Sequence, residues 1–426
     1  MGKNVVIVGG GMAGLAASIY LARGGRTVTI FEKRRDLGGR AITHLRHGFR
    51  FNLGPHAFYR GGAGSAVLRE LGISVRGGVP DGNGIAMRGG ERHRFPGNPW
   101  SLITTGLWNL KEKIEAARLL MRVRGTRNVS RFAAMSERQW LDENVSSERV
   151  RQVLEALFRL ATYCHEAEKI SAAAAVGQLR RAMRGVIYVD EGWQKLVDAL
   201  HSSAVAAGVN FVTSSRIVAL DVDGAVRAIE FGELEADAQD TAEMRRPQPG
   251  KREHPGTRLA TDTVLLAVDP PTARELLGDM SWPPMRPVMA SCLDIALSRL
   301  PKPENIFALG IDRPLYFSVH SKWAQLTPKG GALIHVVRYG SGEESELEAL
   351  LDEMQPGWRE VTVHRRFLPS MIVSNALIAP APATRPAPIT PIPGLYLAGD
   401  WVGDVGLLSD AALASARTAA RAILAV

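Results

Sequence analysis

A glycine-rich turn near the N-terminus carries the first pattern with chemical meaning. The apolar, β-branched run 4–9 predicts a buried strand and ends at Gly9, and Gly11 and Gly14 follow it. In such a turn the first glycine permits a tight bend and the second lets the backbone approach a diphosphate. The third glycine lets the following helix pack closely against the strand. This spacing predicts a site for a nucleotide diphosphate.

The elements around this turn strengthen the prediction. Residues 15–23 have helical character, and the N–H groups at the start of that helix, with Met12 and Ala13, would face the anion. The run 27–32 predicts a second strand, which ends at Glu32. An acid at this position can bind ribose hydroxyls and would repel a 2′-phosphate. The alternative is a glycine turn that binds nothing.

A second glycine pair with a basic residue follows soon after Glu32. Gly38, Gly39 and Arg40 come directly after Asp36 and Leu37. A guanidinium group beside a diphosphate makes a strong and oriented contact. The alternative for Arg40 is a solvated surface arginine.

This second motif resembles the GGR motif of the flavin amine oxidase and phytoene desaturase superfamily, which also contains protoporphyrinogen oxidases. The resemblance implies non-covalent FAD as the cofactor, with the glycine pair and Arg40 beside its diphosphate and flavin. Five later segments resemble the family in the same order along the chain: 51–56, 188–196, where Trp193 replaces a glycine of the family pattern, 216–218, 394–401 and 406–412. They imply cofactor contacts from Gly54 and Pro55, from Val218, from Gly399 and Asp400, and from Leu408 at the start of the last helix.

The resemblance also implies the fold. It predicts an α/β protein in which a glutathione-reductase-type, FAD-binding Rossmann domain is interleaved with an α+β substrate-binding domain. We expect the FAD-binding domain to comprise 1–90, 196–275 and 376–426. The substrate-binding domain would comprise 91–195 and 276–375. The pattern of helices and strands agrees, because a helical block from about 106 to 205 and the strand-rich stretch 288–340 interrupt the nucleotide-binding strands.

Several polar or aromatic side chains could line the substrate cavity. His56 is the main candidate for a catalytic residue, since the resemblance places its neighbours beside the flavin; the alternative is a packed structural histidine. Eight other side chains are candidates, and the alternative for each is a structural role away from the cavity. They are Tyr163, Cys164, His165, Tyr316, His320, Trp323, His335 and Arg338. The histidines do not have the spacing of metal ligands, and we expect no metal.

Two departures from the family bear on the substrate. Amine oxidases of this superfamily usually carry a lysine on a strand of the substrate domain, and the matching segment 289–296 has none. They often also have an aromatic residue before the last helix, where this chain has Leu407. An aromatic face favours a cationic amine, so an apolar wall favours an alkyl or alkene substrate.

Composition limits the remaining classes of protein. The chain has 426 residues, enough for two or three domains, and only two cysteines, which excludes a disulfide framework. Few cysteines favour a reducing compartment, and we expect a cytoplasmic protein. The formal net charge is +9, but no nucleic-acid recognition motif accompanies it, so we expect no nucleic acid partner.

Most of the excess charge lies in one segment. Residues 88–131 hold ten Lys or Arg and three Glu, a net charge of +7. Within 100–124, apolar residues recur at helical spacing, with basic residues around them and two tryptophans near the start. The apolar set is Leu107, Leu110, Ile114, Ala117 and Met121; the basic set is Lys111, Lys113, Arg118, Arg122 and Arg124; the tryptophans are Trp100 and Trp108. This pattern is typical of peripheral contact with a membrane, here its inner face. The alternative is a helix packed on its own domain with a solvated basic edge.

Three main functions remain open from the sequence, besides protoporphyrinogen-like or isomerase chemistry. The first is an FAD-dependent dehydrogenase or desaturase of an apolar, isoprenoid-like small molecule, by hydride transfer to flavin N5. The second is a soluble flavin amine oxidase of a small amine or amino-acid-derived metabolite. The third is a flavin-containing binding protein with an inactive cavity.

Overall fold

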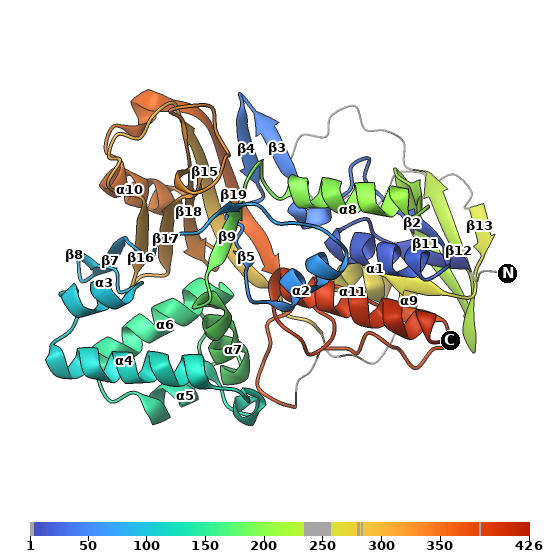
Figure 1. Cartoon of the computed structure of the whole chain (residues 1–426), viewed down its shortest axis with the longest axis horizontal. Coiled ribbons are helices and arrows are strands. Elements are labelled where there is room, and N and C mark those ends of the chain that lie inside the picture. Colours follow the sequence, from blue (N-terminus) through green and yellow to red (C-terminus); the bar gives the residue numbers. More distant parts are fainter. Residues whose placement is uncertain (1–3, 234–256, 279–281, 283, 383–384) are drawn as a thin grey trace.

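The computed structural model describes residues 4–233, 257–278, 282, 284–382 and 385–426. They form two lobes (Figure 1): a Rossmann-type lobe that carries α1 and α11, and a second lobe with a large sheet and a layer of helices. The run 233–257 is polar and contains three prolines, which predicts an exposed hairpin extension. It lies outside the described residues except for its two ends.

A parallel five-stranded sheet forms the centre of the first lobe. Its strand order is β10-β2-β1-β14-β20. The strands are β1 (Asn4–Val8), β2 (Thr27–Phe31), β10 (Asn210–Val212), β14 (Val264–Leu266) and β20 (Leu395–Leu397). Helices α1 (Met12–Arg23), α8 (Gln194–Ala206) and α11 (Leu408–Leu424) pack together on one face (Figure 1).

The alternation of side chains explains why β1 is apolar throughout. Val5 and Ile7 belong to the core under α1, α8 and α11. Val6 and Val8 belong to the core on the opposite face. A strand that is buried on both faces needs a continuous apolar run, which is the pattern that predicted it.

A small antiparallel sheet covers that opposite face. It consists of β11 (Ser215–Asp223), β12 (Ala225–Glu233) and β13 (Thr257–Ala260). Asp223 and Gly224, a residue pair typical of hairpin turns, join β11 to β12, and Gly224 has a positive φ of 65°.

The second lobe is built on a seven-stranded sheet of order β19-β15-β18-β17-β16-β7-β8. All neighbouring strands are antiparallel except β16 and β7. The strands are β7 (Ile85–Arg88), β8 (Glu91–Arg94), β15 (Val288–Leu297), β16 (Phe307–Gly310), β17 (Leu315–Val319), β18 (Ala332–Tyr339) and β19 (Thr362–Ser374).

Helices cover both faces of this sheet. Helix α10 (Glu344–Met354) packs on one face. A layer of helices shares a core with the other face. This layer comprises α3 (Pro99–Thr104), α4 (Leu110–Gly125), α5 (Glu137–Asn144), α6 (Glu148–Thr162) and α7 (Ala172–Ala182). No helix among the described residues is both long enough and apolar enough to span a bilayer.

Short elements connect the lobes. They are the hairpin β3 (Thr43–Arg46) and β4 (Phe49–Asn52) and the strands β5 (Phe58–Tyr59), β6 (Gly77–Gly78) and β9 (Val186–Val189). The helices α2 (Ala63–Glu70) and α9 (Pro270–Leu277) belong to the first lobe, where α2 packs against α11 and α9 packs against β11. Strand β9 pairs with both β5 and β6, so the chain crosses between the lobes at this point.

The architecture confirms the predicted α/β fold class, with a parallel Rossmann-type sheet and a second, α+β lobe. The five parallel strands all fall inside the ranges predicted for the FAD-binding domain. One difference concerns the first boundary: β7 lies before residue 91 yet pairs in the seven-stranded sheet. The second lobe therefore begins before β7, a few residues earlier than predicted. No change of composition marks this boundary in the sequence.

Candidate functional site

The three fingerprint glycines occupy three different environments. A Cβ atom on Gly9, which has a φ of 105°, would lie 2.6 Å from the carbonyl oxygen of Ala267. A Cβ atom on Gly14 would lie 2.0 Å from the carbonyl oxygen of Gly9. No described atom lies within 4 Å of a Cβ built on Gly11. Gly9 and Gly14 are therefore needed by the fold, whereas the space beside Gly11 is open to a ligand.

The N-terminus of α1 opens onto the same space. Gly11 is its N-cap residue; no side chain caps the helix, and its first turn contains no acid. The first N–H groups of a helix have no partner within the helix, so those of Met12 and Ala13 can bind an anion. This supports the predicted diphosphate site.

Glu32 is held beneath the turn. Its side chain is 8% exposed, and its Oε2 accepts a hydrogen bond from the Gly10 N–H at 2.7 Å. Its Oε1 accepts one from the Arg34 N–H at 2.9 Å. Carboxylate oxygens accept more than one hydrogen bond, so Glu32 can still bind the ribose hydroxyls predicted from the sequence.

The second glycine pair lies against the first turn. Gly38 forms a parallel bridge with Gly11 and donates its N–H to the Gly10 carbonyl oxygen at 2.9 Å. Arg40 follows in the short 3-10 helix Gly39–Ala41. Two motifs that are separate in the sequence therefore meet beside the open space at Gly11.

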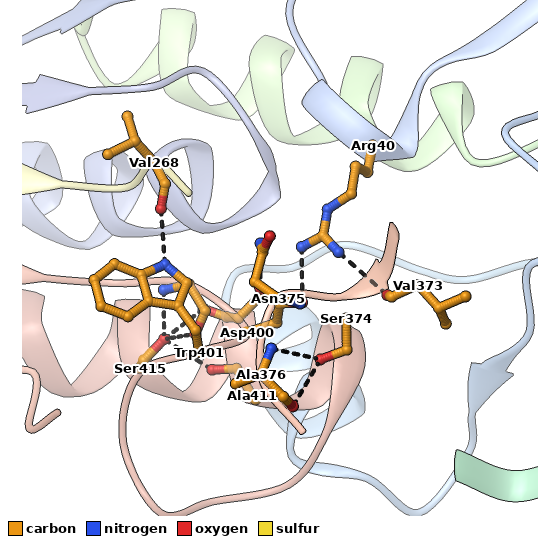
Figure 2. A network of polar contacts seen from close by, with 12 residues as sticks. Arg40, Val268, Val373, Ser374, Asn375, Ala376, Asp400, Trp401, Ala411 and Ser415 are labelled. Atoms are coloured by element: carbon orange, nitrogen blue, oxygen red, sulfur yellow. Dashed lines mark hydrogen bonds and ion pairs between the residues drawn. The ribbon is translucent and has the colours of Figure 1, made fainter. Parts of the chain in front are cut away.

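Arg40 reaches from this turn to the C-terminal end of β20 (Figure 2). Its Nη2 lies 2.8 Å from Oδ2 of Asp400, and its Nη1 donates to the Val373 carbonyl oxygen at 3.1 Å. The exposed fractions of the two side chains are 39% for Arg40 and 3% for Asp400. The structure thus brings together Arg40 and Asp400, two of the three charged residues that the sequence predicted for the cofactor site.

Asp400 is held by a partner that sequence analysis missed. Asn375 donates to its carboxylate from the backbone N–H and from Nδ2, both at 2.9 Å. Burial alone would raise the pKa of Asp400, but Arg40 and Asn375 outweigh it and hold the pKa below its ordinary value. Asp400 is therefore a fixed carboxylate that can accept hydroxyl hydrogen bonds.

A second missed residue, Arg385, holds the turn before α11. It donates to the carbonyl oxygens of Asp400 at 2.9 Å and Gly406 at 3.0 Å. Burial lowers its pKa to about 10, so it remains charged at neutral pH. No local sequence pattern marks Asn375 or Arg385, because their roles depend on contacts between distant segments.

The last helix begins at Leu408, as the resemblance required. Leu408 has a φ of 55°, and no side chain caps this end of α11. Asp410 in the first turn is buried and accepts a hydrogen bond from the Gly64 N–H at 2.8 Å. This contact joins α11 to α2 and orients the helix end.

Val218 lies at an irregularity in β11. The pairing with β12 passes from Ile217 and Phe231 to Ala219 and Glu230, which leaves Val218 as the extra residue of a bulge. The extra residue of a bulge is unpaired in the ladder, so its backbone can bind another group. An adenine contact from Val218 stays a prediction, and this geometry supports it.

The segment with Gly54 and His56 joins the two lobes. Gly54 has a φ of 78°, and a Cβ there would lie 2.3 Å from the sulfur of Met371. His56 Nδ1 lies 3.0 Å from the Gly54 carbonyl oxygen and its Nε2 lies 3.2 Å from that of Arg40. Both ring nitrogens thus face backbone carbonyls, and the ring packs edge-on against Trp193. This arrangement favours a positioning role for His56 over that of a catalytic base, which stays a prediction.

Removal of His56 is expected to change how stability depends on pH. Burial lowers the pKa of His56 to about 4, below the ordinary value. Between about pH 6.5 and pH 4 the unfolded chain therefore binds a proton that the folded chain does not, and stability falls as the pH falls. In His56→Gln the free energy of unfolding should fall less over this pH range, by at most about 3 kcal/mol. Denaturant unfolding of the apoprotein at several pH values measures this difference. Parallel stability curves for the two proteins would contradict this assignment.

The other cavity candidates separate into two groups. Tyr316, His320 and His335 meet at the centre of the second lobe, with the two histidine rings 4.4 Å apart. The Tyr163 hydroxyl donates to the Pro55 carbonyl oxygen at 3.4 Å. The remaining four lie elsewhere: Cys164 is in a separate apolar cluster, His165 is exposed, Trp323 packs near β4, and Arg338 pairs with Glu346 on α10.

Comparison with known families identifies this architecture. The model of the family described as flavin containing amine oxidoreductase matches residues 12–291. The chain belongs to this family. As a flavin containing amine oxidoreductase it is an FAD-dependent enzyme, and the open space at Gly11, the uncapped helix end and the buried acids Glu32 and Asp400 fit that cofactor.

Individual relatives say less about the substrate. The carotenoid 3,4-desaturase of Haloarcula japonica is 50% identical over 54 residues, which are 13% of this chain and 11% of that protein. An oxidoreductase from Methanosarcina mazei has a TM-score of 0.72 at 19% identity, over 98% of this chain and 99% of that one. A putrescine oxidase bound to putrescine has a TM-score of 0.69 at 16% identity, over the whole of both chains. The two structures share the fold of this flavin containing amine oxidoreductase.

Proposed function

We propose that this FAD-dependent oxidoreductase dehydrogenates an apolar, isoprenoid-like substrate that it takes from a membrane surface. FAD, when bound, supplies the redox chemistry by accepting a hydrogen with its bonding electron pair. The chain's own residues then have to bind the substrate, exclude water and receive the remaining proton. The observation that carries the proposal is the outer surface of α3 and α4.

This surface combines exposed apolar side chains with a basic surround. Trp100 is 68% exposed, Leu110 is 74% exposed and Met121 is 65% exposed. Ile103 and Ile114 are also exposed and complete the stripe. Leu107 and Trp108, which the sequence pattern included, are buried instead, because they precede α4 and pack inward. We refer to Trp100, Ile103, Leu110, Ile114 and Met121 as the apolar stripe.

Basic residues border the stripe. Lys111, Arg118, Arg122 and Arg124 are exposed on α4. Lys113 donates to the Ile103 carbonyl oxygen at 2.7 Å and so ties α4 to α3. Large apolar side chains surrounded by cations are typical of a surface that enters the headgroup region of anionic lipids. The helices lie at the outer edge of the second lobe (Figure 1), where a bilayer can reach them. The proposal places the protein at the cytoplasmic face of a membrane.

Two features of the interior support an apolar substrate over an amine. Strand β15 contains no lysine. The residue before α11 is the buried Leu407, so the aliphatic side chain replaces the aromatic face that a cationic amine would prefer. Oxidation of a small amine remains the alternative.

The deciding experiment is anaerobic bleaching of the flavin. The yellow holoenzyme would be mixed separately with the apolar and the polar extract of its source cells while the visible absorbance is recorded. Bleaching by the apolar extract alone is the expected result. Bleaching by the polar extract alone would overturn the proposal and favour amine oxidation.

Charges placed in the stripe should abolish membrane binding. Burial of one large apolar side chain contributes about 1.5–3 kcal/mol, so Leu110→Asp with Met121→Asp should weaken binding by at least about 100-fold. Cosedimentation with vesicles of phosphatidylglycerol and phosphatidylcholine measures this. Leu45→Asp is the matched control, since Leu45 is also exposed but lies on β3. Equal binding by all three proteins would show that the stripe does not contact lipid.

A further inference from the structure

A cavity of about 250 Å³ lies between α2, the strands β5 and β9 (Figure 1) and the segment 73–75. None of the residues that we place at the FAD site lines it. Pockets for drug-sized ligands usually enclose about 300–1,000 Å³, so this cavity suits a smaller molecule. We refer to it as the α2 cavity.

The end of α2 builds the floor of the α2 cavity. Gly72, which has a φ of 80°, donates its N–H to the Arg69 carbonyl oxygen at 3.0 Å. The next N–H, of Ile73, reaches back to the Leu68 carbonyl oxygen at 2.8 Å. This pair of bonds is a Schellman ending, which brings the side chains of Leu68 and Ile73 together. Both side chains are buried and both line the cavity.

The walls of the α2 cavity are also apolar. Phe58 on β5 lies opposite Ile187 on β9 in an antiparallel pair, and both side chains line the cavity. Val75 lines it from the segment that leads into β6. An alkyl chain placed between these side chains and the floor would leave water, which is favourable.

Four polar side chains complete the lining of the α2 cavity: Arg60, Ser65, Arg69 and Ser74. Ser65 and Arg69 are four residues apart on α2, so they lie on the same face of that helix. Among the described residues, neither guanidinium group and neither hydroxyl group has a hydrogen-bond or ion-pair partner. All four groups are therefore free to bind a ligand.

The charge around these groups is positive. Arg184 adds a further cation near Arg60, since its Cδ lies 2.6 Å from the position that a Cβ would take on Gly61. Helix α2 contains one acid, Glu70, but Arg417 on α11 already contacts its carboxylate at 2.7 Å. Cations that line a cavity without a neighbouring acid attract an anion.

We propose that the α2 cavity binds a small amphipathic carboxylate, such as a medium-chain fatty acid. Its alkyl chain lies against Phe58, Leu68 and Ile73, and its carboxylate binds Arg60 and Arg69. The planar guanidinium group matches a carboxylate in shape and charge. This binding site goes beyond the oxidoreductase activity and does not depend on the substrate that we propose for the enzyme.

Titration calorimetry of the FAD-loaded protein with three probes tests the chemistry of the ligand. Octanoate has the chain and the charge, octanol has the chain alone, and inorganic phosphate has the charge alone. Octanoate should bind once per chain and at least about 10-fold more tightly than either of the others. Equal binding of octanol would mean that the guanidinium groups contribute nothing, and equal binding of phosphate would mean the same for the apolar walls. Either result, or no binding of octanoate, would overturn the proposal.

Variants place the binding in the α2 cavity. Arg60→Gln with Arg69→Gln should weaken octanoate binding by at least about 10-fold, and Ser65→Phe, which fills the cavity but keeps both arginines, should do the same. Arg299→Gln with Lys329→Gln is the matched control, because it removes the same charge from exposed positions of the second lobe. The control should bind octanoate like the wild type. Equal binding by all these proteins, or an equal loss in the control, would overturn the proposal. Calorimetry is independent of flavin bleaching, so failure of one proposal is distinguishable from failure of the other.

Discussion

Replacement of Gly11 by alanine is expected to weaken FAD binding without destabilising the apoprotein. The added methyl group meets no described atom within 4 Å, and Gly11 has an extended backbone that alanine adopts freely. It would instead occupy space that the diphosphate needs. Overpacking by one methyl group costs about 1–3 kcal/mol, which is about a 5- to 150-fold loss of affinity. Fluorescence titration of the apoprotein with FAD measures the affinity, and urea unfolding measures the stability.

Gly14→Ala is the matched control for this prediction. Its Cβ would lie 2.0 Å from the Gly9 carbonyl oxygen, so α1 has to move away from β1. This variant should lose both FAD affinity and stability of the apoprotein. If Gly11→Ala were destabilised as much as Gly14→Ala, the space beside Gly11 would have to be structural and not a cofactor site.

Removal of the Arg366 side chain should produce a large loss of stability. Arg366→Leu leaves the completely buried Asp294 without its guanidinium partner. Breaking a buried ion pair from one side costs about 3–5 kcal/mol, because an uncompensated charge remains. The pKa of Asp294 should rise in the variant, so the deficit should shrink as the pH falls. Urea unfolding of the apoprotein at several pH values measures both effects.

The neighbouring residue on β19 provides the control. Arg365 pairs with Glu344 and Glu348 on α10, but its side chain is 44% exposed. Exposed ion pairs contribute about 0–1 kcal/mol, so Arg365→Leu should be nearly neutral. Similar losses of stability in the two variants would mean that the buried pair of Asp294 and Arg366 stabilises the fold no more than an exposed ion pair does.

The sequence by itself determined the cofactor end of this protein. The roles of Gly9, Gly11 and Gly14 depend on a single turn between a strand and a helix, and Glu32 follows on the next strand. The elements predicted there lie within a few residues of the observed ones: β1, α1, β2 and the start of α11. Local geometry of this kind is encoded by spacing along the chain.

Only the tertiary structure decided which polar residues meet. Asp294, His335 and Arg366 become neighbours through the pairing of β15 with β18 and β19, and Asn375 reaches Asp400 across a chain reversal. From the sequence His335 was one of several cavity candidates, and no pattern marked Asp294 as its partner. Likewise, the apolar residues of 100–124 share one pattern, yet Leu107 is buried while Leu110 is exposed, because α4 begins at Leu110. Strand register and the packed face of a helix are set by contacts between distant segments, and a linear pattern does not contain them.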